Sequence, residues 1–532
     1  MPNSANDEVL LTSVRAAVLD LLRGFGITTI FGNPGSTELP LFRDFPGDFR
    51  YVLGLQEAVV VGMAEGYAQA TRNAAFVNLH SAAGVGHAMG NIFTAFRNRT
   101  PLLITAGQQA RAILPFDPFL YSKEATELPK PYVKWSCEPA RAEDVPLAIA
   151  RAYYIAMQPP RGPVLVSIPA DDWARRCEPV APRVVSRELR PEPRVLDAIG
   201  DALDAALHPA FVVGSAIDRD GAWDDVVQLA ERHSAVVWVA PMSGRCSFPE
   251  DHPLFAGFLP PMRERIVDLL APHDVVFALG AAAFTYHVEG AGPHLQPGSS
   301  LVQLIEDPQI AAWAPHGTAA VGNIRLGVRD LLVRAAPPVR QRPARRAVPP
   351  RIEPSSPMSA AFVMQTLAEV RDRKSIVVEE APSSRRAMQA HLPFFHTETF
   401  YTMDSGGLGW GLPAAVGVAL AKPDAKVIGL IGDGSSLYSI QALWSAAQLR
   451  LPITFIILKN QRYAALPEFA PAFGFRENEP LPGTELPGID FVALARGQGC
   501  EAVSVSRAGE LRAVLVDALT AQAPTLVEVD IA

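Results

Sequence analysis

One stretch in the final third of the chain, residues 427–460, constrains the fold more than any other. It begins with an apolar run, VIGLI, continues through Gly432-Asp433-Gly434, and ends with a second apolar run that stops at Asn460. Short apolar runs of this kind are typical of parallel strands that are buried on both faces. We therefore interpret the stretch as a strand, helix and strand of an α/β sheet.

The glycine-rich turn after the first run predicts an anion site. Ligands of open α/β sheets bind beyond the carboxyl ends of the strands. Gly432 and Gly434 let the backbone approach a phosphate, and Ser435 can cap a helix whose free N–H groups attract an anion. Asp433 would repel a phosphate unless a cation lies between them. Mg²⁺ fits, because protein oxygens and phosphates hold it together, and Asn460 supplies a second oxygen.

The alternative is that Asp433 is an ordinary turn residue and Asn460 an ordinary loop amide. The spacing favours the metal site, because residues 435–459 suffice for one helix and one strand that return Asn460 to a position beside Asp433. The GDG…N arrangement resembles the diphosphate and Mg²⁺ motif of thiamine-diphosphate enzymes. The resemblance implies thiamine diphosphate and Mg²⁺ as cofactors.

Composition limits the class of protein. The 532 residues are too many for one core, and 49% hydrophobic with 19% charged residues is typical of globular proteins. A net charge of −8 argues against a nucleic-acid partner, which needs clustered Lys and Arg. The four cysteines are far apart, so neither a zinc site nor a disulfide framework is expected. Without a signal-peptide pattern or an apolar stretch of about 20 residues, we expect a cytoplasmic protein with no membrane partner.

Composition shifts predict three domains. Two segments, 178–195 and 336–357, are rich in proline and charge and are typical of extended, solvated linkers. They separate an N-terminal domain (1–177), a middle domain (196–335) and a C-terminal domain (358–532). Apolar strands alternate with helices in each, which predicts an α/β fold of three doubly wound parallel sheets. The middle domain has no GxGxxG fingerprint, so we expect no nicotinamide or flavin.

The N-terminal domain offers several polar side chains at the ends of predicted elements. Ser36 follows the strand ITTIF and can donate to a carboxylate, although a helix N-cap with Glu38 nearby explains it equally well. Glu57 opens an apolar helix; a first-turn glutamate commonly complements the helix dipole, but these surroundings indicate burial. His80 ends the strand AAFVNL and is the better catalytic candidate, whereas we expect His87 to pack within its helix.

The segments FGNPGSTELP, LQEAVVVGMAEGYAQA, NLHSAAG, AGQQARA and GPVLVSIPADDW resemble the benzoylformate decarboxylase family of thiamine-diphosphate enzymes. The resemblance extends through nearly the whole chain. It implies non-oxidative decarboxylation of a small 2-oxo acid to an aldehyde and CO₂, with a possible carboligase side activity. It also implies sites built across two subunits, and therefore a homodimer as the smallest unit and a homotetramer as the expected assembly.

The resemblance assigns a role to each candidate. Glu57 would bind the pyrimidine ring of the cofactor and favour its imino tautomer, and Ser36 would bind the substrate carboxylate. His80 would exchange a proton with the alkoxide and His287 with the enamine, although a surface loop histidine explains His287 as well. The expected Mg²⁺ ligands are Asp433, Asn460 and the backbone carbonyl of Arg462. The expected cofactor contacts are Ser383, Gly406, Leu408, Gly432, Gly434, Ser435 and Tyr463.

The departures from the family pattern concern the substrate pocket. Thr402 stands where close relatives carry a bulky aromatic residue, and Phe119-Leu120 stands where they carry paired aliphatic residues. Gln461-Arg462 replaces the family's Gly-Thr. We therefore expect a reshaped pocket, and the resemblance implies an aryl substrate such as benzoylformate. The expected pocket residues are Phe119, Leu120, Thr402, Ala465 and Phe469.

Two other functions stay open. An acetolactate-synthase-like carboligase shares GDG…N and the glutamate, but typically lacks histidines that match His80 and His287. A catalytically silent homologue would bind the cofactor and serve as a structural or regulatory subunit. Glu57, His80, Asp433 and Asn460 together argue against the silent homologue.

Overall fold

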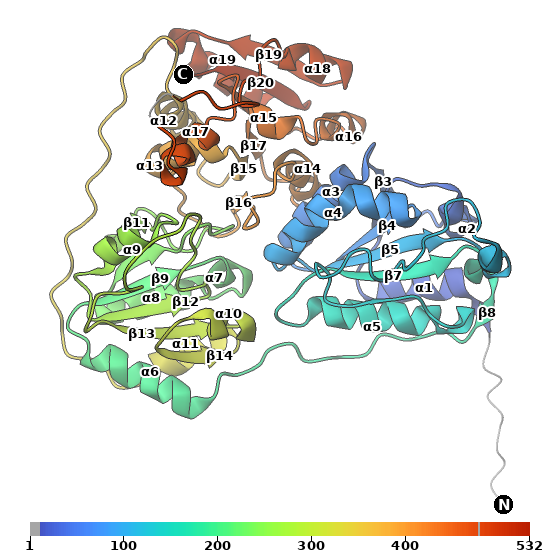
Figure 1. Ribbon diagram of the computed structural model, residues 1–532, viewed down its shortest axis with the longest axis horizontal. Coiled ribbons are helices and arrows are strands. Elements are labelled where there is room, and N and C mark those ends of the chain that lie inside the picture. The colour runs from blue at the N-terminus through green and yellow to red at the C-terminus, as the bar shows by residue number, and fades with distance from the viewer. Residues whose placement is uncertain (1–10, 477–478) are drawn as a thin grey trace, which may run out of the picture. The chain divides into compact units, whose positions relative to one another are not determined.

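The computed structural model describes residues 11–476 and 479–532 of the chain (Figure 1). Three six-stranded sheets carry the fold, and every strand pair within them is parallel. The predicted α/β class with three parallel sheets is therefore confirmed. Across the described ranges, we find no helix with the length and apolar character that a membrane span requires.

The chain forms two compact units. The first contains the described residues up to Arg187 together with Ser405–Lys422 and Ser439–Leu449. The second contains Glu188–Asp404, Pro423–Tyr438 and Arg450–Ala532. The first unit therefore takes two segments from the last third of the chain, and the second unit holds the middle and C-terminal sheets.

The sheet of the first unit is covered by helices on both faces. Figure 1 shows α1 (Val14–Gly24) and α5 (Val145–Met157) on one face, and α3 (Glu57–Thr71) and α4 (Ser81–Arg97) on the other. Apolar side chains of α1 and α5 join those of the strands in one buried core. The strands, in spatial order, are β3 (Arg50–Leu53), β2 (Thr29–Gly32), β4 (Ala75–Leu79), β5 (Leu102–Gln108), β7 (Val164–Pro169) and β6 (Ser136–Cys137). A separate antiparallel pair joins β1 (Thr12–Ser13) to β8 (Arg176–Cys177).

Helix α14 (Gly411–Ala421) completes this unit by packing against α3. Both helices are apolar, and glycines let their backbones approach closely. A Cβ atom at Gly66 would lie 2.3 Å from the Ala414 carbonyl oxygen, and one at Gly417 would lie 1.9 Å from that of Met63. Side chains larger than hydrogen are therefore excluded at both positions.

The second unit contains the middle sheet. Its strands, in spatial order, are β11 (Phe255–Phe258), β10 (Val236–Val239), β9 (Pro209–Val213), β12 (Val275–Leu279), β13 (Ser300–Ile305) and β14 (Thr318–Val321). One buried core joins this sheet to α6 (Pro193–Ala205), α8 (Trp223–His233) and α11 (Ile324–Leu332). A second core, on the other face, includes α9 (Arg263–Leu270). The shorter helices are α7 (Ala216–Arg219) and α10 (Pro308–Trp313).

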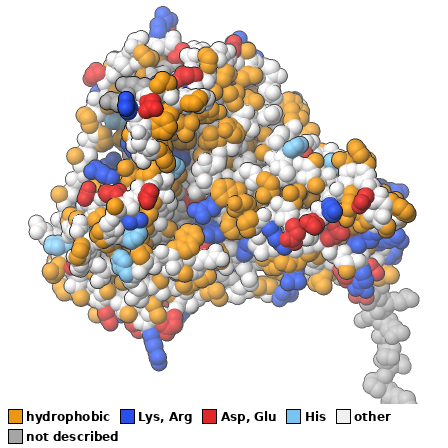
Figure 2. Space-filling model, in the orientation of Figure 1, with side chains coloured by type: hydrophobic (Ala, Val, Ile, Leu, Met, Phe, Trp, Pro, Cys, Tyr) orange, Lys and Arg blue, Asp and Glu red, His pale blue; other side chains and the backbone are white. Residues whose placement is uncertain are grey.

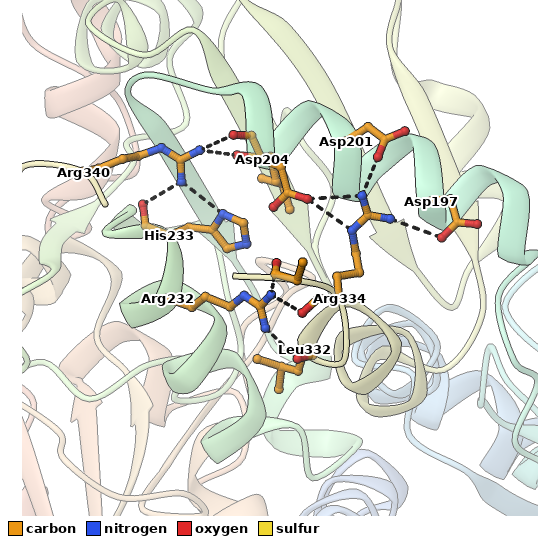
Figure 3. A network of polar contacts seen from close by, with 10 residues as sticks. Asp197, Asp201, Asp204, Arg232, His233, Leu332, Arg334 and Arg340 are labelled. Carbon is orange, nitrogen blue, oxygen red and sulfur yellow. Dashed lines mark hydrogen bonds and ion pairs between the residues drawn. The ribbon is translucent and has the colours of Figure 1, made fainter. Parts of the chain in front are cut away.

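Two arginines, Arg334 just before the predicted second linker and Arg340 within it, bind helix α6 of the middle domain (Figure 3). Arg334 pairs with three carboxylates of α6, which are those of Asp197, Asp201 and Asp204. Arg340 donates to the carbonyl oxygens of Leu203 (2.7 Å), Asp204 (2.8 Å) and Ala206 (2.7 Å) at the end of α6. Arg340 is therefore held against the middle domain, while the assignment of 336–357 as a linker stays a prediction; all its residues are described and none belongs to a helix or strand.

The C-terminal sheet carries the predicted strand, helix and strand of residues 427–460. Its strands, in spatial order, are β16 (Phe400–Thr402), β15 (Ile376–Glu380), β17 (Val427–Gly432), β18 (Thr454–Lys459), β20 (Thr525–Asp530) and β19 (Glu501–Val505). Along the chain, α16 (Ala442–Gln448) separates β17 from its parallel neighbour β18. Other helices of this region are α12 (Ala360–Val370), α13 (Arg385–His391), α15 (Asp433–Ser436), α17 (Ala465–Phe469), α18 (Phe491–Gly497) and α19 (Ala508–Thr520).

The surface carries charges of both signs. On the face shown in Figure 2, acidic and basic side chains lie among hydrophobic ones. Over the whole sequence, acidic residues slightly outnumber basic ones, which gives the net charge of −8.

Candidate active site

Asp433 and Asn460 meet at the carboxyl ends of neighbouring strands. Gly432 of β17 is in register with Leu458 of β18, so the residues that follow each strand lie side by side. The Asp433 carboxylate accepts hydrogen bonds from the backbone N–H groups of Asn460 (3.0 Å) and Gln461 (2.6 Å) through Oδ2. The proximity that the spacing predicted is therefore present.

The surroundings of Asp433 fit a divalent cation. Burial raises the pKa of its carboxyl group, and three backbone N–H donors only partly offset that effect. Within the described ranges, Asp433 pairs with no Lys or Arg, so its buried negative charge has no counter-charge. The Asn460 Oδ1 atom accepts from Arg462 N at 3.2 Å and adds a neutral oxygen. Oxygen donors of this kind suit Mg²⁺.

Phosphate oxygens would have to complete such a coordination shell. No group of three His, Cys, Asp or Glu side chains that could hold a metal occurs among the described residues. Arg462 is exposed and forms an isolated antiparallel bridge with Glu485. The backbone carbonyl of Arg462 as a ligand stays a prediction.

The glycine turn is shaped by Tyr463. A Cβ atom at Gly434 would lie 2.4 Å from the Tyr463 ring, so only glycine fits beneath it. Ser435 is buried directly beyond the turn. Ser383 lies just past β15, the strand paired with β17, and is half-buried. Gln461 has φ +59°, in the left-handed region that favours the glycine found there in the family pattern.

The hydroxyl group of Thr402 contacts other side chains of the protein. Thr402 is 2% exposed, and it contacts both members of a buried ion pair, Glu379 Oε2 (2.8 Å) and Arg385 Nη2 (2.7 Å). The small cavity beside it, about 30 Å³, has room for about one water molecule. The role of Thr402 in the substrate pocket stays a prediction, and the structure gives it little support.

His287 contacts a predicted pocket residue. Its ring stacks on that of Phe469, with centroids 4.2 Å apart and an interplanar angle of 27°. His287 lies between β12 and β13 of the middle sheet, and Phe469 ends α17, so the second unit brings a middle-domain side chain to the C-terminal domain. Ala465, at the start of α17, is half-buried. A histidine and an aromatic ring therefore share one surface in the second unit.

In the first unit, His80 is held by a buried carboxylate. Its Nδ1 lies 2.8 Å from Glu38 Oε2 and 3.1 Å from Thr37 Oγ1. A Cβ atom at Gly35 would lie within 2.4 Å of the ring, so the glycine turn packs directly on the imidazole. Because the carboxylate accepts, we assign the proton to Nδ1, which leaves Nε2 as an acceptor. Glu38 therefore orients the ring, which the sequence did not indicate. Its neighbour Ser36 is exposed, and the N-cap position belongs to Gly35.

Glu57 is buried at the start of α3, as predicted. Its Oε2 lies 3.0 Å from His87 Nδ1, and its side chain is 11% exposed. The His87 side chain is 62% exposed. The expectation that His87 packs within its helix is therefore wrong, because α4 directs the imidazole at Glu57 rather than into the core.

The glycine loop before α14 is tied to α3 and α4. Asn91 Nδ2 donates both to Ala58 O (2.7 Å) and to Gly409 O (3.2 Å), so one amide links the start of α3 to this loop. Trp410 Nε1 donates to the buried Glu65 carboxylate at 2.6 Å. The loop carries Gly406, with φ +72°, and Leu408. Its anchors, Asn91 and Glu65, have no sequence signal that we recognised.

The predicted site residues are divided between the two units. Phe119 is 87% exposed and Leu120 lies beside it on the surface of the first unit. The first unit holds Ser36, Glu57, His80, Phe119, Leu120, Gly406 and Leu408. The second holds His287, Ser383, Thr402, Gly432, Asp433, Gly434, Ser435, Asn460, Arg462, Tyr463, Ala465 and Phe469.

Three family models match the chain in order. The N-terminal TPP binding domain of thiamine pyrophosphate enzymes matches residues 12–127, their central domain matches 196–331, and their C-terminal TPP binding domain matches 382–529. Together with the glycine turn and the paired Asp433 and Asn460, the matches define the class, which is that of the thiamine pyrophosphate enzymes.

Full-length relatives narrow the class. The chain is 45% identical to benzoylformate decarboxylase of Pseudomonas aeruginosa over 98% of this chain and 99% of the relative. The structure of a thiamine diphosphate-dependent 4-hydroxybenzoylformate decarboxylase from Rhodococcus jostii is 40% identical, with a TM-score of 0.94 over 98% of this chain and 99% of that one. An acetolactate synthase large subunit from Parasynechococcus marenigrum is 28% identical over 97% of this chain and 87% of the relative. The chain therefore belongs to the benzoylformate decarboxylase-like thiamine pyrophosphate enzymes, which are 2-oxo acid decarboxylases.

Proposed function

We propose that this protein removes CO₂ from an aryl 2-oxo acid and releases the aldehyde, with thiamine diphosphate and Mg²⁺ bound. Thiamine-diphosphate-dependent decarboxylation of a 2-oxo acid is the activity of its family. The observation that carries the proposal is His80, whose Nδ1 is held by the buried Glu38 while Nε2 stays available. A histidine fixed in this way can accept and return a proton at Nε2.

The described residues fit the cofactor at both ends. Asp433, Asn460 and the Arg462 carbonyl would hold Mg²⁺ on the diphosphate, beside Gly432, Gly434, Ser435, Tyr463 and Ser383. Glu57 would bind the pyrimidine ring, with Gly406 and Leu408 at the cofactor's bend. When bound, thiamine diphosphate supplies the nucleophilic carbon and stores the electron pair that CO₂ leaves behind. Burial of Glu57 would strengthen a hydrogen bond from its carboxyl group to a ring nitrogen of the bound cofactor.

The remaining residues bind the substrate and move protons. Ser36, whose side chain is exposed, donates its hydroxyl to the substrate carboxylate. His80 exchanges a proton through Nε2, and His287 serves the later proton transfer. The stacking of His287 on Phe469 supports an aryl substrate, because it places a flat ring surface beside the proton carrier. Phe119, Leu120, Ala465 and Thr402 would complete the pocket.

We infer a homodimer as the smallest active unit and a homotetramer as the assembly. The exposed Phe119 supports this inference, because a pocket residue that is 87% exposed in one chain needs cover from elsewhere. Each site would take Glu57 from one subunit and Asp433 from another. A cytoplasmic location belongs to the same proposal.

The test is a substrate panel. The purified protein is loaded with thiamine diphosphate and Mg²⁺ and offered aryl and branched aliphatic 2-oxo acids. CO₂, aldehyde and acyloin are then measured. We expect CO₂ and aldehyde, with aryl acids preferred, and loss of turnover in His80→Ala. Acyloin as the main product would favour a carboligase, and bound cofactor without turnover would favour a silent homologue.

A further inference from the structure

Among the residues that the structure describes, the carboxylate of Glu57 has one polar partner, and it lies outside the catalytic set expected from the family. His87 Nδ1 on α4 lies 3.0 Å from Glu57 Oε2 on α3. Throughout the described chain, no hydrogen-bond donor meets the other oxygen, Oε1. We propose that His87 is a positioning residue, which holds Glu57 by Oε2 and leaves Oε1 free for the pyrimidine ring. This inference rests on the proposed function.

Glu57 is not held by the end of its own helix. The N-cap residue of α3 is Gln56, whose Oε1 accepts from Ala58 N (2.6 Å) and Val59 N (3.3 Å). A first-turn glutamate can bind such N–H groups itself, but here Gln56 has taken them. The Glu57 side chain, with three rotatable torsions, therefore needs another restraint to keep one orientation.

Helix α4 supplies that restraint on two sides. Gly84 and His87 are three residues apart and share one face of α4. A Cβ atom at Gly84 would lie 3.4 Å from both Cγ and Oε1 of Glu57, so the glycine packs against the stem of the side chain. The imidazole of His87 meets its head group. The carboxylate is thus enclosed by one helix while one of its oxygens stays unbonded.

The contact defines the tautomer of His87. Because Oε2 accepts the hydrogen bond, we assign the proton to Nδ1. Nδ1 then donates to Glu57, while the His87 side chain as a whole is largely exposed.

The test compares His87→Ala with His87→Asn, whose side-chain amide can still donate to a carboxylate. Binding of thiamine diphosphate with Mg²⁺ to the apoprotein is followed by tryptophan fluorescence, and the bound cofactor's tautomers by near-ultraviolet circular dichroism. In His87→Ala we expect about tenfold weaker cofactor binding and less of the imino tautomer, because a hydrogen bond to a charged group is lost. His87→Asn should recover most of both. The control is His316→Ala, an exposed histidine of the second unit, which should match the wild type.

The outcomes separate this inference from the proposed function. Wild-type cofactor binding and an unchanged tautomer signal in His87→Ala would overturn the role of His87. The role of His87 would also be overturned if His87→Ala and His87→Asn weakened cofactor binding equally and both lowered the melting temperature of the apoprotein. Such a result would indicate that the contact is merely structural. A wild-type protein that binds thiamine diphosphate but decarboxylates none of the acids would contradict the proposed function alone.

Discussion

His233 ends helix α8 in the core of the middle domain, where it is 3% exposed. Its Nδ1 lies 3.2 Å from Arg340 Nη1, which reaches it from the linker (Figure 3). Burial lowers the pKa of His233 to about 4, and the positive charge of Arg340 acts in the same direction. The folded protein therefore keeps this imidazole neutral at pH values where the unfolded chain binds a proton.

The lowered pKa predicts a pH dependence of stability. Between pH 6.5 and about 4 the unfolded state binds the proton and the folded state does not, so the free energy of unfolding falls as the pH falls through this window. The contribution of the neutral His233 to the free energy of unfolding is fully present above pH 6.5, and it is about 3 kcal/mol at most. Urea unfolding of the wild type and His233→Gln at pH 7.5 and pH 5 measures it.

We expect the wild type to lose more stability than His233→Gln between the two pH values. His316→Gln is the control, because that histidine is exposed and should lose as much as the wild type. Equal losses in the wild type and His233→Gln would show that the buried imidazole does not titrate as described.

The sequence predicted where individual candidate residues lie better than it predicted their partners. Glu57 and His80 lie at the ends of elements, and the apolar runs around them indicated their places. Glu38 and His87 were not recognised as their partners, because those contacts join residues 42 and 30 positions away on other elements. The face that each helix turns toward its neighbour is decided by packing, which one sequence does not show.

At the scale of elements, the contact between α3 and α14 shows the same limit. Apolar composition predicted the helix that Glu57 opens, and glycine in α3 is typical of close helix packing. Nothing in the pattern identified α14, more than 300 residues away, as the partner. The parallel sheets were easier to predict, because apolar strands alternate with helices along the chain.

The α3–α14 contact predicts a large effect of one methyl group. In Gly66→Ala the new Cβ would lie 2.3 Å from the Ala414 carbonyl oxygen, so the two backbones must separate. We expect a loss of about 3 kcal/mol in the free energy of unfolding, as for other overpacked cores. Urea unfolding followed by circular dichroism checks it.

Gly90→Ala is the matched control. Gly90 lies on the exposed side of α4, and a Cβ atom there meets nothing within 4 Å. Because alanine favours a helix, we expect a gain of up to about 1 kcal/mol. If Gly66→Ala behaved like Gly90→Ala, the close approach of α3 and α14 would be refuted.

At the scale of the whole molecule, the expected site residues are shared by two compact units. Glu57 belongs to the first unit and Asp433 to the second. The three sheets could be predicted from alternating strands and helices, but this division could not. The first unit recruits Ser405–Lys422 and Ser439–Leu449 from the predicted C-terminal domain, a long-range pairing without a local signal.

A site shared by two subunits predicts complementation. Glu57→Gln and Asp433→Asn should each be inactive alone. In mixed dimers, one site combines both substitutions and the other has neither, so we expect roughly half of the wild-type turnover. Co-expression with two different affinity tags isolates the mixed species, and aldehyde release measures its activity.

Each variant paired with the wild type serves as the control and should also keep about half of the activity. Mixed dimers of the two variants without turnover would show that one chain supplies both Glu57 and Asp433 to a site. That result would remove the argument for a shared site and leave the assignments of the individual residues in place.

The first unit includes segments from the last third of the chain, so it cannot be completed early during synthesis on the ribosome. The first 187 residues emerge long before α14 has been translated, so the nascent chain carries α3 with its glycine-lined apolar side uncovered. The first unit cannot complete its folding until translation passes Leu449. A product that terminates before Ser405 would retain the exposed helix and become a target for chaperones and proteases.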